Sequence, residues 1–149
     1  MRYKDINVVL QEIPNEITLC FTITGCNVRC DGCHSPYLWK EGTGEKLSDS
    51  FLTENLNRYK NTVSCVLFMG GEWNEDLLDK LKICKKHGFK TALYTGLTIE
   101  EISDDIVNEL DYIKVGKWIK ELGGLDKKET NQRLINLTNN EIMNHYFHK

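Results

Sequence analysis

The feature that most constrains the fold is an alternation of short apolar runs with amphipathic segments between residues 16 and 115. The apolar runs, rich in β-branched and aromatic residues, predict strands over residues 16–23, 63–69, 90–95 and 111–115. Strands that alternate with helices imply a parallel sheet with right-handed crossovers. We therefore expect an α/β chain with about four parallel strands.

The segments between these strands show the apolar periodicity of helices. Residues 49–60 and 74–87 each carry an apolar stripe, with Asn74 as the expected N-cap and Gly88 as the stop of the second helix. A third helix is expected to begin at Thr98, because Thr98 and Glu101 have the spacing of a capping box.

Both ends of the chain predict β-hairpins. Residues 6–13 read as a strand that pairs with residues 16–23 across a turn at Pro14-Asn15. Residues 134–137 and 141–147 are expected to form a second hairpin, although the last segment could instead be a short helix.

Chemically distinctive residues follow each predicted parallel strand. A cysteine-rich loop follows the first, Gly70-Gly71-Glu72 the second and Thr95-Gly96 the third, while the fourth carries Lys114 and ends at Gly116. In parallel sheets ligands bind at the carboxyl ends of the strands. We therefore expect one binding site at this edge.

Three cysteines of that loop, Cys26, Cys30 and Cys33, lie within eight residues. They could form a zinc site with His34, but all four groups then come from one loop, and adjacent Cys33 and His34 ligate one metal awkwardly. A thioredoxin-like pair would use Cys30 and Cys33 and ignore Cys26. The spacing favours an iron–sulfur cluster with three thiolate ligands and one open iron. Cys20, Cys65 and Cys84 are expected to be buried thiols.

The composition of the chain limits the kinds of partner and the cellular compartment that we expect. The 149 residues carry a net charge of -3 with interspersed signs, which argues against a nucleic-acid surface. No apolar run has membrane-spanning length and no apolar signal segment opens the chain. We expect one cytoplasmic domain over residues 1–149, with reduced cysteines.

The Cys-x3-Cys-x2-Cys spacing resembles that of the radical S-adenosylmethionine (SAM) enzymes, and Gly70-Gly71-Glu72 resembles their second motif. Over residues 16–137 the chain resembles more closely the activating proteins of anaerobic ribonucleoside-triphosphate reductases. That resemblance rests on Cys33-His34-Ser35-Pro36, Phe68-Met69-Gly70-Gly71-Glu72-Trp73, Lys114-Val115-Gly116, and Gly123-Gly124-Leu125 followed by Thr130-Asn131-Gln132-Arg133.

The resemblance implies a small, open, partial βα barrel of the radical SAM type, since a full barrel needs about 250 residues. It implies a 4Fe-4S cluster on Cys26, Cys30 and Cys33, and no catalytic residue apart from this cofactor chemistry. The SAM contacts that it implies are Gly32, Cys33, His34, Gly70, Gly71, Glu72, Thr95, Lys114 and Arg133.

The implied reaction is reductive cleavage of SAM, followed by formation of a glycyl radical on the large subunit of the anaerobic reductase. Flavodoxin or ferredoxin would supply the electron. Two alternatives stay open: a radical SAM enzyme with another protein or small-molecule substrate, and a zinc-stabilised binding module.

The sequence departs from the family pattern at two places. Many radical SAM enzymes have an aromatic residue before the third cysteine, where this chain has Gly32, so the adenine must be held differently. Residues 1–15 lack the glycine- and arginine-containing run of many activating proteins and stay outside the resemblance.

Overall fold

The computed structural model describes residues 1–25 and 44–148 of the chain. Predictions that fall on Cys26, Cys30, Gly32, Cys33 and His34 lie outside the described residues. The elements follow in the order β1 (Arg2–Val9), β2 (Thr18–Ile23), β3 (Glu45–Lys46), α1 (Asp49–Tyr59), β4 (Cys65–Met69), α2 (Leu77–Lys86), β5 (Lys90–Tyr94), η2 (Ile99–Glu101), α3 (Asp104–Asn108), β6 (Tyr112–Val115), β7 (Arg133–Asn136), β8 (Glu141–Ile142) and η3 (Asn144–Phe147), where η marks a 3-10 helix.

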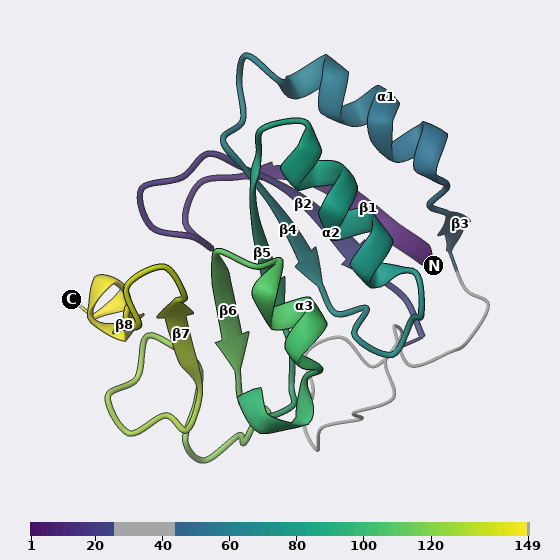
Figure 1. Ribbon diagram of the computed structural model, residues 1–149. Coiled ribbons are helices and arrows are strands. Elements are labelled where there is room, and N and C mark those ends of the chain that lie inside the picture. The colour runs from purple at the N-terminus through teal and green to yellow at the C-terminus, as the bar shows by residue number, and fades with distance from the viewer. Residues whose placement is uncertain (26–43, 149) are drawn as a thin grey trace.

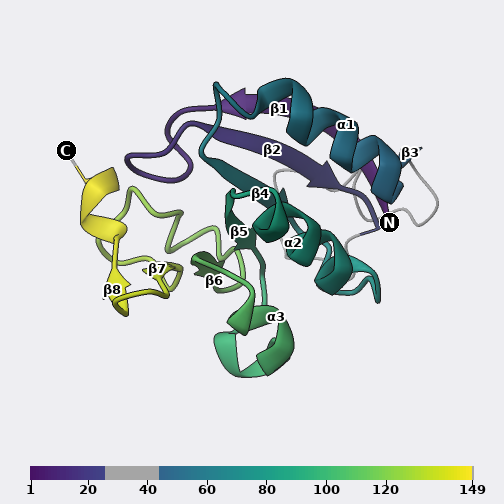
Figure 2. The same cartoon turned by 45° about the horizontal axis from the view of Figure 1, so that its top comes forward.

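The described strands form one sheet in the order β3-β1-β2-β4-β5-β6-β7-β8 (Figure 1). Strands β2, β4, β5 and β6 pair in parallel, and antiparallel strands flank them on both sides. In Figure 2 the sheet curves from β1 to β8 and its edges stay apart. The α/β prediction is confirmed for the described residues, although antiparallel pairings outnumber parallel ones there, four to three.

The α-helices lie together on one face of the sheet (Figures 1 and 2). Between them and the sheet lies an apolar core to which Phe21 and Phe68 contribute stacked rings, with centroids 5.6 Å apart. A smaller core covers the opposite face, where Ile13 and Met143 pack against the strands. Within residues 1–25 and 44–148, each helix is too short or too polar to cross a membrane.

The first hairpin is shifted from its prediction. A strand was expected over residues 6–13, but β1 ends at Val9 and the chain then bends under the sheet. The reason is burial, because Ile13 is fully enclosed in the smaller core and cannot also continue an edge strand. The turn at Pro14-Asn15 is present, with Asn15 at φ +70°.

The second helix starts later than expected, since Asp76 rather than Asn74 precedes its first residue. Asn74 instead closes a turn, in which its backbone N–H donates to the carbonyl of Gly71 at 2.9 Å. The Gly70-Gly71-Glu72 segment is thus part of a turn, and the helix begins only after this turn.

The third predicted helix is interrupted. The capping box of Thr98 and Glu101 is present, but it opens only η2. Extended backbone at Ile102 and Ser103 ends that turn, and the Ser103 hydroxyl then caps α3 by accepting from the N–H of Ile106.

The predicted C-terminal hairpin is confirmed as β7 and β8. Its last segment ends as η3, so both readings of residues 141–147 were partly right. The side chain of Asn144 fixes this end, because it accepts from the N–H of Leu134 at 2.9 Å and donates to the carbonyl of Gln132 at 2.8 Å. The short strand β3, which pairs with β1, was not predicted.

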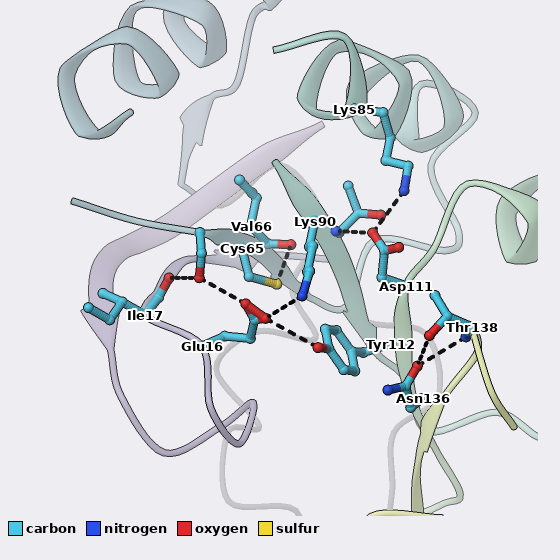
Figure 3. A network of polar contacts seen from close by, with 12 residues as sticks. Glu16, Ile17, Cys65, Val66, Lys85, Lys90, Asp111, Tyr112, Asn136 and Thr138 are labelled. Atoms are coloured by element: carbon cyan, nitrogen blue, oxygen red, sulfur yellow. Dashed lines mark hydrogen bonds and ion pairs between the residues drawn. The ribbon is translucent and has the colours of Figure 1, made fainter. Parts of the chain in front are cut away.

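Polar contacts of the buried Glu16 side chain tie the amino-terminal ends of the parallel strands together (Figure 3). The carboxylate of Glu16 accepts hydrogen bonds from Ser64 at 2.9 Å and Tyr112 at 3.2 Å, and pairs with Lys90 at 3.2 Å. These partners come from the beginnings of β4, β5 and β6, so Glu16 crosses three strands. Burial and the Glu16 carboxylate both raise the pKa of Tyr112, which therefore stays a neutral donor.

We predict that Glu16→Ala destabilises the fold by about 2 kcal/mol, because the buried hydroxyl of Tyr112 loses its acceptor, whereas the exposed Ser64 keeps the carbonyl of Ile17 as an acceptor. The ion pair with Lys90 adds little, since that side chain is 55% exposed. Urea unfolding measures the change. Glu54→Ala, at an exposed position of α1, is the control and should stay within about 0.5 kcal/mol of the wild type. Equal midpoints for Glu16→Ala and the wild type would contradict the role of this network.

Candidate functional site

The register of the sheet brings the carboxyl ends of the parallel strands to one edge. Thr22, Met69, Tyr94 and Lys114 form the last continuous cross-strand row. Beyond this row the N–H of Gly70 still donates to the carbonyl of Tyr94 at 2.8 Å, and that of Thr95 to the carbonyl of Lys114 at 2.9 Å. The residues that follow the strands are therefore held close together.

Two glycines make the turn after β4. Gly70 has φ +86° and Gly71 has φ +111°, in the region that L side chains rarely adopt. A Cβ at Gly70 would lie 2.6 Å from the ring of Trp73. The turn therefore requires glycine at both positions and packs closely against the ring of Trp73.

Glu72 is joined to Thr95 across the ends of β4 and β5. The Thr95 hydroxyl donates to Oε1 of Glu72 at 2.7 Å and accepts from the N–H of Leu97 at 3.1 Å, which fixes the direction of its proton. Oε2 of Glu72 is buried and has no hydrogen-bond partner among the described residues. Burial raises the pKa of Glu72, and the bond from Thr95 partly opposes this rise.

Lys114 lies on the opposite face of the sheet from the helices. Its Nζ is 4.4 Å from the centroid of the Tyr94 ring, a cation–π distance. Both residues line a hollow of about 350 Å³, to which the loop after β1 contributes Glu12. Oε2 of Glu12 is buried without a hydrogen-bond partner in the described residues. Sequence reasoning missed Glu12, because only the folded loop brings it to the strands.

Arg133 and Lys114 do not converge. Arg133 pairs with Val115, which belongs to the core under the helices, while Lys114 pairs with Leu134 in the smaller core. Side chains of neighbouring strand residues alternate between the faces of a sheet. The guanidinium of Arg133 donates to the backbone carbonyls of Thr130 and Gln132, so it closes its own turn.

The cysteines divide into two groups. Cys26, Cys30 and Cys33 lie outside the described residues, and Cys26 follows the last residue of β2, Ile23, by three positions. The second group, Cys20, Cys65 and Cys84, is confirmed as free and buried. Burial raises the pKa of each of these thiols, which disfavours the thiolate that a metal needs. Residues 1–25 and 44–148 contain no cluster of three His, Cys, Asp or Glu side chains suited to a metal.

Comparison with known proteins gives two matches. Residues 17–139 match the protein family described as a 4Fe-4S single cluster domain. The pyruvate formate-lyase-activating enzyme of Clostridium pasteurianum is 38% identical over 78 residues, which cover 48% of this chain and 33% of that protein. The matched region therefore spans about a third of the relative's length.

We predict that Gly70→Ala destabilises the protein more than Gly88→Ala. Both glycines have φ +86°, so both variants carry the same backbone strain of about 1–2 kcal/mol. A Cβ at Gly88 meets nothing within 4 Å, whereas one at Gly70 displaces the ring of Trp73. Urea unfolding compares the two variants, and equal losses would show that the contact with Trp73 is unimportant.

We predict that Glu72→Gln becomes more stable relative to the wild type as the pH rises from about 4 to about 8. The pKa of Glu72 in the folded protein lies above its ordinary value of 4.5, so the unfolded chain releases this proton first. Ionisation therefore costs the folded wild type stability above that value, and glutamine removes the cost. Urea unfolding at several pH values measures the difference. A constant difference between Glu72→Gln and the wild type over this pH range would contradict the prediction.

Proposed function

The chain belongs to the family of 4Fe-4S single cluster domains, and from this premise we propose that it is a radical SAM activating enzyme for a glycyl-radical enzyme. We propose further that Cys26, Cys30 and Cys33 hold the cluster and that the open sheet is a partial barrel of the radical SAM type. The observation that carries the proposal is the Glu72–Thr95 pair beside two left-handed glycines, at the sheet edge from which the cysteine segment departs.

The residues present fit the cofactor. The cysteine segment offers three thiolates, the donor set that leaves one iron of a 4Fe-4S cluster without a protein ligand. The described edge offers a buried carboxylate oxygen without a partner, at Glu72 Oε2. When bound, the cluster and SAM supply the electron-transfer chemistry that cleaves a carbon–sulfur bond. The side chains described below supply binding and orientation.

The Gly70-Gly71-Glu72 turn is proposed to receive the ammonium group of SAM. Oε2 of Glu72, which has no hydrogen-bond partner among the described residues, is an acceptor for an ammonium. Thr95 orients the carboxylate by holding Oε1. A bound cation would lower the pKa of Glu72 again, because an opposite charge favours the ionised form. The site therefore holds a carboxylate whose buried charge is compensated when the ligand binds.

Lys114 is proposed to assist at the carboxylate end of SAM, because its ammonium lines the hollow beside Tyr94 and can pair with a carboxylate of a ligand. Arg133 could reach a carboxylate only by giving up its bonds to Thr130 and Gln132. Gly32, Cys33 and His34 complete the proposed contacts from the cysteine segment. No side chain is proposed as a catalytic acid or base.

The proposed target is the large subunit of anaerobic ribonucleoside-triphosphate reductase, with flavodoxin or ferredoxin as electron donor. The motifs Lys114-Val115-Gly116 and Thr130-Asn131-Gln132-Arg133 support this choice by resemblance. A second candidate is pyruvate formate-lyase, favoured by the similarity to the activating enzyme of Clostridium pasteurianum. Both targets would bring a protein loop to the site, which suits an open sheet.

We predict that anaerobic reconstitution with iron and sulfide gives a brown protein that, once reduced, converts SAM to 5'-deoxyadenosine and methionine. Chromatography measures the products. Electron paramagnetic resonance then distinguishes the targets, because a glycyl radical signal should arise on the anaerobic reductase and not on pyruvate formate-lyase. The opposite pattern would reassign the target. A colourless protein that binds zinc and no iron would overturn the radical SAM assignment in favour of a binding module.

Cysteine variants separate the two groups of thiols. Cys30→Ala should abolish the cluster absorbance and leave the far-ultraviolet circular dichroism unchanged. Cys84→Ala is the matched control, because Cys84 is buried in the core and should keep the cluster at some cost in stability. Global unfolding of Cys30→Ala would instead indicate a structural metal.

A further inference from the structure

A hollow of about 530 Å³ lies beyond the ends of β5 and β6. Residues 96–101, residues 115–117 and Asn131 line it. Leu97, Ile99 and Val115 belong to or pack against the core under the helices and make this lining largely apolar. A largely apolar hollow with a few polar groups is typical of a small-molecule site.

Asn131 supplies one of these polar groups. Its Nδ2 donates to the carbonyl of Lys117 at 2.9 Å, which settles the orientation of the amide. The other amide atom, Oδ1, is buried and has no hydrogen-bond partner among the described residues. A buried acceptor without a donor is costly to leave unsatisfied. It therefore marks the place where a ligand N–H would be bound.

Side-chain hydrogen bonds of the two neighbouring residues hold the segment around Asn131 in place. On one side the Thr130 hydroxyl donates to the carbonyl of Gly123 at 2.8 Å, and on the other Gln132 Nε2 donates to the carbonyl of Gly116 at 3.2 Å. Gly116, at φ +108°, permits this close packing, because a Cβ there would lie 3.0 Å from the carbonyl oxygen of Asn131. Two segments that are far apart in the sequence therefore pack against each other: Lys114-Val115-Gly116 and Thr130-Asn131-Gln132-Arg133.

The hollow begins one residue along the chain from the proposed ammonium site. Its first lining residue, Gly96, follows Thr95, whose hydroxyl is bonded to Glu72. The N–H of Gly116 donates to the carbonyl of Leu97 at 2.9 Å and so joins the two strand ends that form the walls. A ligand with its ammonium at Glu72 could extend along this edge into the hollow.

We propose that this hollow binds the adenine ring of SAM and that Oδ1 of Asn131 accepts a hydrogen bond from the exocyclic amino group. The proposal rests on the function proposed above and assigns a specificity residue to it. Leu97, Ile99 and Val115 contact the ring in place of the aromatic side chain absent at Gly32. Glu100 and Glu101 also line the hollow, against one cation from Lys117, which disfavours a phosphate and suits a neutral ring.

The test uses S-adenosylhomocysteine and its inosine counterpart, in which an oxo group replaces the amino group. Isothermal titration calorimetry with the anaerobically reconstituted protein should show about tenfold tighter binding of the adenine compound, the size of one good hydrogen bond. Hydrogen–deuterium exchange on the wild type should show protection of residues 96–101 and 115–117. This second readout needs no variant.

Two substitutions at one position separate recognition from folding. Asn131→Ala should bind both compounds alike, because the acceptor is gone. Asn131→Asp retains an acceptor and should keep the preference for adenine, although both variants lose the bond to Lys117. Asn57→Ala, on the exposed side of α1, should behave as the wild type.

The outcomes distinguish this proposal from the one on which it rests. If the wild type cleaves SAM yet binds both compounds equally, or shows no protection at 96–101 and 115–117, the adenine assignment is wrong and the radical SAM function stands. Retention of the preference in Asn131→Ala would also overturn the role of Asn131. If the wild type neither cleaves SAM nor binds either compound, both proposals fail.

Discussion

The parallel register of β2, β4, β5 and β6 is the constraint on which the described structure depends. Parallel pairing places every strand beginning at one edge and every strand end at the other. At the first edge, Glu16 bonds to residues at the beginnings of three strands and so links these strands. At the second edge, backbone bonds from Gly70 and Thr95 hold the strand ends together. A rigid base thus supports an edge that carries polar and glycine residues.

The carboxylates at the two edges differ in how many hydrogen-bond donors surround them. Glu16 is surrounded by donors, and its carboxylate contributes to the connection between strands. Glu72 has a donor for Oε1 only, and burial raises its pKa. Asn131 repeats this pattern with an amide, since one atom is fixed by Lys117 and the other has no partner in the described residues. Half-satisfied polar groups at strand ends are costly to the fold alone, which is why they point to a ligand.

Much of the fold could be predicted from local patterns. Apolar runs identified β2, β4, β5 and β6 to within two residues, because each is buried on both faces and needs continuous apolar character. The ends of elements were less predictable where tertiary contacts override propensity. Ile13 lies in a core rather than in the strand predicted for it. The turn from Gly71 to Asn74 moves the start of α2 further along the chain. The pairing of β3 with β1 had no local signal at all, since two exposed residues carry no pattern.

For the candidate site, the sequence by itself determined which chemistry is available: three closely spaced cysteines, a Gly-Gly-Glu segment and the residues that follow each strand. Those are properties of neighbours along the chain, and spacing alone reveals them. The tertiary structure decided which groups act together. It joined Glu72 to Thr95, separated Lys114 from Arg133 by the alternation of faces, and brought Asn131 to Gly116. Such pairings depend on strand register and close packing between distant segments, which no local pattern specifies.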